Sequence, residues 1–241
     1  MERRDHHDWT SEAYVTEWVE RQQSRDAARS ERLQLLCDLL PLPENARSTI
    51  LDVGAGYGPV SKFILDHFPH ATCLAQDGSA PMLQHARQLL AGYGARLSFH
   101  QSDLFDQDWL PQQLGPFDAV VSALCLHNLR DFQRISEIYG DICGHLKPGG
   151  VFLNLDLLNA PTPELQRRYF SVAAERRQRE GASRHDAEAL RQRAQQPTTQ
   201  ASAYSFPANL DQHLEALRAA GFTHVDCFWK DLQQALYGGY A

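Results

Sequence analysis

Short apolar runs alternate with amphipathic helical patterns from about residue 50 to residue 156, and this alternation predicts a parallel sheet covered by helices. The predicted strands are residues 50–53, 71–77, 96–100, 117–122 and 151–156. Between them, apolar residues recur three and four positions apart, as one face of a helix requires. Strands and helices that alternate in this way form right-handed crossovers, so the expected fold class is α/β with a doubly wound sheet.

The pattern changes on both sides of this region. A helical region is predicted from residue 11 to residue 40, where two prolines end it. After the fifth strand, two polar helices are expected at residues 163–180 and 184–195, with a break near Gly181. These helices interrupt the alternation and form an insertion, which is a candidate lid over the end of the sheet.

The last part of the chain is expected to complete the sheet. A helix at residues 209–220 precedes two strands, residues 222–229 and 232–237, that are joined by a tight turn at Lys230 and Asp231. The expected organisation is one domain with four parts: an N-terminal helical cap (1–45), a core (46–158), a helical lid insertion (159–207), and a C-terminal helix with two strands (208–241).

Composition and charge narrow the class of protein. Hydrophobic residues make up 43% and charged residues 22% of the chain, as in ordinary globular proteins. A net charge of −7 argues against an extended nucleic-acid surface. No apolar run suits a membrane span or a signal core. The five cysteines lie far apart without a C-x-x-C pair, and no metal-ligand cluster stands out, so we expect a cytoplasmic, metal-free protein with reduced thiols.

Arginines gather in the insertion. Residues 161–206 contain eight arginines and five acids, a net charge of +3. Because acids are interleaved with the arginines and can pair with them along helix faces, a solvated helical insertion is favoured. An anion- or RNA-binding patch is the alternative.

A glycine-rich turn after the first predicted strand is the central local signal. Residues 49–59 read T-I-L-D-V-G-A-G-Y-G-P. Glycines tolerate positive φ and let a ligand approach the backbone, and the helix that follows offers unpaired N–H groups. The spacing is G-x-G-x-G followed by Pro59, which departs from the G-x-G-x-x-G of dinucleotide-binding folds. A nucleotide-type ligand is favoured over a purely structural turn.

Acidic and histidine side chains follow four of the predicted strands. Asp77 lies 23 residues beyond Gly54, close to the spacing at which an acid binds ribose hydroxyls in nucleotide folds. Asp103, His127 and Asp156 follow the third, fourth and fifth strands. Because ligands of such sheets bind at the carboxyl ends of the strands, these four side chains are expected to converge on one crevice.

Several motifs, in this order, resemble those of a known family. They are L-D-V-G-A-G-Y-G, Q-D-G-S-A-P-M-L-Q-H-A-R, S-D-L, F-D-A-V-V-S-A-L-C-L-H-N-L, L-K-P-G-G and A-G-F-T-H-V. Together they are similar to the motifs of class I S-adenosylmethionine-dependent methyltransferases, and most to the small-molecule branch. The resemblance implies a seven-stranded sheet of order 3-2-1-4-5-7-6 with an antiparallel last strand. It also implies S-adenosyl-L-methionine as cofactor and a small-molecule acceptor as partner, with no membrane and with a homodimer left open.

The resemblance also assigns cofactor contacts. The glycine turn would lie against the methionine part, with the acid at the end of the first strand near its amino group through water. Asp77 would take both ribose hydroxyls, Met82 would pack on the adenine, and the acid after the third strand would meet the adenine amino edge. The backbone after the fourth strand would flank the methionine tail. With Tyr14 added from the N-terminal helical region, the expected cofactor-binding residues are Asp52, Gly54, Ala55, Gly56, Gly58, Asp77, Gly78, Met82, Asp103, Leu104, Ala123, Leu124 and Tyr14.

The expected reaction is in-line methyl transfer, with most of the catalysis supplied by positioning. For a hydroxyl acceptor, His127 is the candidate base and Asp156 the reserve; a structural role for His127 stays open. After the fourth strand the sequence reads S-A-L-C, where amino methyltransferases of nucleobases or glutamine often carry N/D-P-P-Y/F, and this departure argues against that chemistry.

Three alternatives remain: a tRNA or protein methyltransferase that uses the arginine-rich insertion, a non-catalytic S-adenosylmethionine-binding protein, and an NAD-dependent oxidoreductase, against which Pro59 counts.

Overall fold

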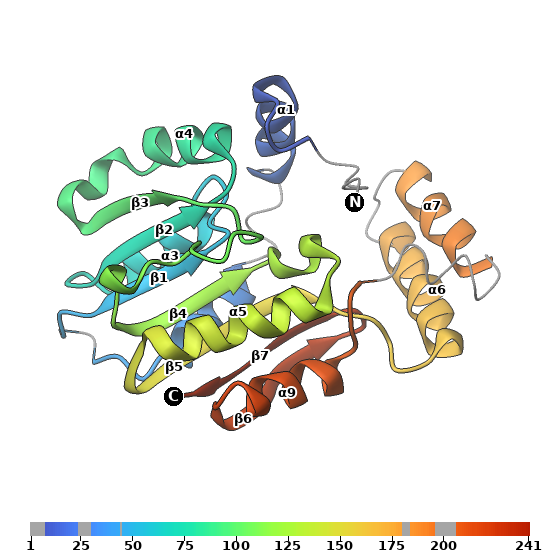
Figure 1. Cartoon of the computed structure of the whole chain (residues 1–241). Coiled ribbons are helices and arrows are strands. Elements are labelled where there is room, and N and C mark those ends of the chain that lie inside the picture. Colours follow the sequence, from blue (N-terminus) through green and yellow to red (C-terminus); the bar gives the residue numbers. More distant parts are fainter. Residues whose placement is uncertain (1–7, 24–29, 44, 180–183, 196–205) are drawn as a thin grey trace.

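A computed structural model of the chain describes residues 8–23, 30–43, 45–179, 184–195 and 206–241. Within these ranges, seven strands form one sheet of order β3-β2-β1-β4-β5-β7-β6 (Figure 1). The strands are β1 (Thr49–Val53), β2 (Thr72–Asp77), β3 (Leu97–Gln101), β4 (Phe117–Ala123), β5 (Leu146–Leu157), β6 (Thr223–Asp231) and β7 (Gln234–Tyr240). Strands β1 to β5 pair in parallel, whereas β7 is antiparallel to both β5 and β6. The predicted strand order and the antiparallel last strand are confirmed.

Helices cover both faces of the sheet because successive strand residues point into opposite cores. Ile50 of β1 packs in one core with α2 (Ser30–Asp38) and α3 (Pro59–His67). Leu51 and Val53 pack in the other core with α5 (Phe132–His145) and α9 (Leu210–Ala219) (Figure 1). All three strand residues are fully buried. A strand buried on both faces needs a continuous apolar run, which is the pattern that the sequence shows.

The predicted N-terminal helical region consists of two helices in the described residues, α1 (Glu12–Gln23) and α2, and residues 24–29 between them lie outside the described part. Helix α1 lies beside α4 (Ala80–Leu89) (Figure 1). Helix α4 begins after Ser79, whose hydroxyl caps the helix by accepting a hydrogen bond from the backbone N–H of Met82 at 3.2 Å.

The insertion forms a helical hairpin after the carboxyl end of β5. Its helices, α6 (Pro163–Arg179) and α7 (Arg184–Gln195), pack against each other, and the predicted break near residue 181 lies outside the described residues (Figure 1). Arg176 donates to both carboxylate oxygens of Asp231 in β6, at 2.7 and 2.6 Å. Other arginines pair with acids of the hairpin itself: Arg167 with Glu164, Arg168 with Glu175, and Arg191 with Glu188. This pairing is what the solvated-helix interpretation predicts.

The last hairpin turns later than predicted. Lys230 and Asp231 still belong to β6, and the turn consists of Leu232 and Gln233. Leu232 adopts a φ of 50°, in the left-handed region, and its carbonyl accepts a hydrogen bond from Lys230 Nζ at 2.6 Å. The prediction was wrong because it followed the polar residues that favour turns, whereas the turn here contains a leucine.

A buried polar cluster lies between α5, α9 and the β5–β7 pair. The Tyr139 hydroxyl lies 2.7 Å from His213 Nδ1 and 3.1 Å from the Tyr237 hydroxyl, and Asn154 Nδ2 donates to the Tyr237 hydroxyl at 2.8 Å. Burial lowers the pKa of His213 to about 4, against an opposing contribution from Asp156. The imidazole is therefore uncharged at neutral pH, and its Nδ1 forms a hydrogen bond with the Tyr139 hydroxyl.

We expect this cluster to make folding stability depend on pH. The folded-state pKa of His213 is about 4, below the ordinary value of 6.5, so its contribution to stability is complete above pH 6.5 and is lost as the pH falls toward 4. The loss at pH 5 should be about 2 kcal/mol. In urea unfolding between pH 7 and pH 4.5, the free energy of unfolding should fall more steeply for the wild type than for His213→Gln. Parallel curves would contradict this origin of the pH dependence.

Candidate active site

The glycine turn joins β1 to α3, and its conformation explains its composition. Gly54, Gly56 and Gly58 have φ values of 67°, 57° and 93°, which side chains with a Cβ rarely adopt. A Cβ on Gly54 would lie 2.0 Å from Cys125 Sγ, and one on Gly58 would lie 2.5 Å from Leu90 Cδ1. A Cβ on Gly56 would meet no atom within 4 Å. A side chain therefore has no room at Gly54 or Gly58, whereas Gly56, the middle glycine of the turn, faces open space.

Asp77 ends β2 and binds the glycine turn directly. Its Oδ2 accepts from the backbone N–H of Gly56 and its Oδ1 from that of Ser79, both at 2.8 Å. Burial raises the pKa of the Asp77 carboxyl, and the N–H groups of Ser79, Gly56 and Gly78 act in the opposite direction. Two predicted site elements, the turn and the acid, are therefore in contact, and each oxygen keeps further lone pairs for a ligand.

Gln76, which was not among the predicted site residues, also holds the turn. Its side chain is fully buried, and its Oε1 accepts from the N–H of Gly54 at 3.0 Å. Its Nε2 donates to the carbonyl oxygen of Ser102 at 2.8 Å, so it links the turn to the end of β3. The available signal was an amide residue inside the otherwise apolar strand A-T-C-L-A-Q-D.

The loop after β3, which carries Asp103 and Leu104, is held by a buried arginine. Asp103 Oδ1 accepts from the N–H of Phe105 at 3.0 Å. Arg134 of α5 is 5% exposed and donates to the carbonyl oxygens of Leu104 at 2.6 Å and Asp106 at 2.8 Å. Arg134 was not among the predicted site residues; its sequence signal is a charged residue beside the apolar positions of its helix.

Asp52 is fully buried at the end of β1, and one of its oxygens has a partner while the other does not. Its Oδ2 accepts from the Ser61 hydroxyl at 2.6 Å. Its Oδ1 has no hydrogen-bond partner among the described residues. Burial raises the pKa of this carboxyl to about 7, although the bonds from Ser61 lower it. A buried carboxylate oxygen without a hydrogen-bond partner costs free energy, so Oδ1 marks a place where a further polar group fits.

The N-terminal segment packs over the glycine turn and α4. Val15 and Val19 of α1 form a small apolar cluster with Tyr57 of the turn and Met82 of α4. Partly buried aromatic residues flank this cluster: Trp9, Tyr14 and Trp18. The rings of Trp9 and Tyr14 meet edge to face at 5.6 Å, and the carbonyl of Trp9 accepts from the Ser79 hydroxyl at 2.6 Å. Tyr14 and Met82, both predicted site residues, thus belong to one cluster beside the turn.

A histidine and an aspartate form a close pair at the carboxyl ends of β4 and β5. The Leu124 N–H bonds to the Leu155 carbonyl at 2.8 Å, and the chain then forms a short 3₁₀ helix, Leu126–Leu129. His127 Nδ1 lies 2.5 Å from Asp156 Oδ1, and the His127 backbone N–H donates to Asp156 Oδ2 at 3.0 Å. The Asp156 side chain is 2% exposed and that of His127 is 12% exposed.

Cys125 lies among the acids of these strand ends. Burial raises the pKa of its thiol well above the ordinary value, and Asp77, Asp156 and Asp52 raise it further, in that order. The thiol therefore stays protonated. Cys125 also packs against the glycine turn, since a Cβ on Gly54 would lie 2.0 Å from its sulfur. Cys125 was not among the predicted site residues.

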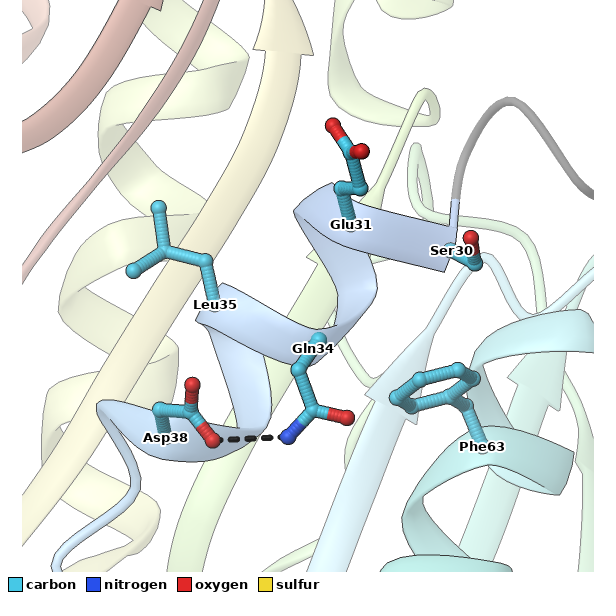
Figure 2. Close-up of a pocket in the computed structure, with 6 residues that line it drawn as sticks. All are labelled: Ser30, Glu31, Gln34, Leu35, Asp38 and Phe63. Carbon is cyan, nitrogen blue, oxygen red and sulfur yellow. Dashed lines mark hydrogen bonds between the residues drawn. The ribbon is translucent and has the colours of Figure 1, made fainter.

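The described residues also form a groove that lies apart from these strand ends. This groove, between α2 and α3, is lined by Ser30, Glu31, Gln34, Leu35, Asp38 and Phe63, none of which is a predicted site residue (Figure 2).

Among the described residues, no group of three His, Cys, Asp or Glu side chains could hold a metal ion. In the same part of the chain, no helix is both long and apolar enough to cross a bilayer.

Comparison with known proteins finds similarity to methyltransferases. Residues 50–150 match a family model described as a methyltransferase domain. A trans-aconitate 2-methyltransferase of Azoarcus sp. (strain BH72) is 30% identical over 122 residues, which are 50% of this chain and 44% of that protein. A malonyl-[acyl-carrier protein] O-methyltransferase of Herminiimonas arsenicoxydans is 29% identical over 188 residues, 77% of this chain and 56% of that protein. The chain thus spans about half the length of these curated relatives.

Solved structures share the fold. An O-methyltransferase family protein from Burkholderia thailandensis has a TM-score of 0.61 at 21% identity, over 96% of this chain and 63% of that chain. Human N-acetylserotonin methyltransferase, solved in complex with SAM, has a TM-score of 0.62 at 17% identity, over 96% of this chain and 57% of that chain.

Residues 50–150, which match the methyltransferase-domain model, contain the glycine turn and Asp77, and the sheet has the strand order that the resemblance to class I S-adenosylmethionine-dependent methyltransferases implies. The family model covers the stretch from β1 into β5, and the N-terminal helices and the α6–α7 hairpin lie outside it.

Proposed function

We propose that this chain transfers a methyl group from S-adenosyl-L-methionine to a hydroxyl group of a small-molecule acceptor. The observation that carries this proposal is the His127–Asp156 pair, which lies at the same edge of the sheet as the glycine turn. A hydroxyl must lose its proton as it attacks, and an imidazole held by a carboxylate is the usual device for accepting that proton.

The described residues fit this cofactor. The open backbone at Gly56 gives room for close approach, and Asp77 offers carboxylate lone pairs for the ribose hydroxyls. The unpaired Oδ1 of Asp52 is suited to an ammonium group, directly or through water. We assign the adenine to the side of Met82 and the loop of Asp103 and Leu104. When bound, the cofactor supplies an activated methyl group on a sulfonium, so this chemistry needs no metal ion.

Asp52→Asn tests the methionine end of this assignment. Because burial raises the folded-state pKa of Asp52 to about 7, its contribution to stability is complete below about pH 4 and is lost as the pH rises through 7. Asparagine does not titrate, so at pH 8 the cofactor-free variant should be more stable than the wild type. Its affinity for S-adenosylhomocysteine should nevertheless fall about tenfold, since an ammonium loses its charged partner. Urea unfolding and calorimetry measure the two effects; a less stable variant with unchanged affinity would contradict both.

In the proposed reaction, Asp156 orients the base and His127 accepts the proton. Asp156 Oδ1 receives His127 Nδ1–H and the Leu157 N–H, and Oδ2 receives the His127 backbone N–H. We therefore assign Asp156 as the orienting group and not as the reserve base. With the proton on Nδ1, the Nε2 lone pair is the acceptor for the hydroxyl proton.

A carboxylate acceptor is the second candidate. It is favoured by the relatives, since two of them are named for methyl transfer to trans-aconitate and to malonyl-[acyl-carrier protein]. A carboxylate is already deprotonated at neutral pH and needs no general base. Under this alternative, His127 would bind the acceptor without removing a proton.

An acceptor screen with a radiolabelled methyl donor separates the two candidates. The pool contains phenols, alkyl alcohols and carboxylic acids, trans-aconitate among them. A methyl ether survives mild alkali, whereas a methyl ester releases volatile labelled methanol. Label that is stable to alkali supports the hydroxyl proposal, and label that is released as methanol supports the carboxylate alternative. Binding of S-adenosylhomocysteine with no transfer to any pool member would contradict both.

A further inference from the structure

Two rings meet beside the carboxyl end of β5, and one short stretch of chain holds both of them. The ring centroids of His127 and Phe206 lie 5.5 Å apart with their planes at 90°, an edge-to-face contact. Asp156 holds His127 through a side-chain and a backbone bond. Three residues further along, Asn159 holds Phe206. Phe206 and Asn159 were not among the predicted site residues.

The Asn159 amide binds the backbone of Phe206 as a neighbouring strand would. Its Nδ2 donates to the carbonyl oxygen of Phe206, and its Oδ1 accepts from the Phe206 N–H at 2.7 Å. The backbone N–H of Asn159 also donates to the carbonyl of Ala208 at 2.9 Å. These three bonds fix the course of the main chain at the point where it returns from the α6–α7 hairpin.

The segments on both sides of this clamp are also fixed. Where the chain leaves β5, the N–H of Ala160 donates to Oε1 of Gln166, a residue that is 4% exposed. Where the chain returns, Asn209 caps α9 in a capping box with Gln212. Phe206 is therefore attached to β5 and α9, although it follows the insertion directly. Groups held on rigid elements keep a more exact geometry than groups on loops.

We propose that Asn159 is a positioning residue of the active site, which fixes Phe206 as the wall of the acceptor pocket beside His127. The proposal rests on the proposed function, because it takes the His127 ring as the base. The half-buried Phe206 ring excludes water from one side of that base and limits the orientations in which an acceptor can approach it. A purely structural role, in which Asn159 only anchors the insertion, is the competing account.

A double-mutant cycle read by NMR in the cofactor-free protein tests the positioning directly. The histidine rings are labelled with ¹³C, and the His127 signals are identified by their absence from His127→Gln. Phe206→Leu should shift these signals, because a perpendicular aromatic ring at 5.5 Å is lost. Asn159→Ala should move them in the same direction, and the double variant should move them no further than Phe206→Leu does. Unchanged His127 signals in folded Asn159→Ala would overturn the proposal.

Methyl transfer provides the second readout, with the acceptor pool of phenols, alkyl alcohols and carboxylic acids as the probe. Asn159→Ala and Phe206→Leu should each lower kcat/KM about tenfold, without additivity in the double variant. Affinity for S-adenosylhomocysteine should stay within about twofold of the wild type, since neither residue belongs to the assigned cofactor site. Additive losses, or an equal loss of S-adenosylhomocysteine affinity, would favour the structural account.

Matched variants keep the test interpretable. Asn159→Asp keeps the side-chain size and the oxygen that accepts from the Phe206 N–H, but it turns a carboxylate oxygen toward the Phe206 carbonyl, so it should show the same changes as Asn159→Ala. Asn45→Ala and Phe228→Leu, an exposed asparagine and a half-buried phenylalanine of β6, should change none of the readouts.

The proposed function and the positioning role fail separately. Full turnover in His127→Ala would show that His127 is not the base, but the NMR evidence that Asn159 positions Phe206 beside His127 would still stand. If the His127 signals do not move in Asn159→Ala, or if the shifts of the two single variants add in the double variant, Asn159 has no positioning role, and His127 remains the proposed base.

Discussion

Replacing Asp77 by alanine should lower the affinity for S-adenosylmethionine and S-adenosylhomocysteine at least a hundredfold. Two hydroxyl groups that donate to one carboxylate contribute about 1.5–3 kcal/mol each, so their joint loss is about 3–6 kcal/mol. The same carboxylate accepts from the N–H groups of Gly56 and Ser79, so its removal also loosens the turn that faces the ligand. Asp77→Asn keeps one acceptor oxygen and should lose less affinity than Asp77→Ala.

Calorimetry with S-adenosylhomocysteine measures this loss, and circular dichroism shows whether the variants remain folded. Asp66→Ala is the control, because Asp66 is an exposed carboxylate of α3 that pairs with Lys62. Its affinity should equal that of the wild type. A folded Asp77→Ala variant with less than a tenfold loss would mean that the adenosyl group does not bind Asp77, and the cofactor assignment would then have to move.

The parts of this site that the sequence predicts are those whose chemistry is local. Positive φ at Gly54, Gly56 and Gly58 restricts the residue type at each position, so the turn is visible as a motif. Asp77 follows its strand directly, and parallel strands end at one edge of the sheet, so its place needs no knowledge of distant contacts. The strand order came from the resemblance, which carries topology that hydrophobic periodicity alone does not specify.

The missed residues act across long sequence separations. Gln76 bonds to a residue 22 positions away, Arg134 to one 30 positions away and Asn159 to one 47 positions away. Periodicity reports which face of an element a residue occupies, but not which partner it meets there. A polar residue within an apolar pattern is the only trace that such a contact leaves in one sequence, and Gln76 and Arg134 show that trace. Asn159 and Phe206, at the ends of the insertion, leave none.

His127→Ala should reduce kcat with a hydroxyl acceptor by about 10²–10⁴ and leave the affinity for S-adenosylhomocysteine unchanged. The reason is that the imidazole accepts a proton in the transition state and contacts no part of the assigned cofactor site. Asp156→Asn should also reduce kcat, because an amide can donate to Nδ1 and favour the wrong tautomer. If the two residues act as a unit, the double variant should be no slower than the slower single variant.

Fixed-time assays of labelled methyl transfer at saturating cofactor give kcat. His70→Ala serves as the control, because His70 is an exposed histidine. Unchanged kcat in His127→Ala removes it as base. If the product of that active variant is also labile to alkali, a carboxylate is the acceptor, because only an acceptor that arrives without a proton can dispense with the histidine.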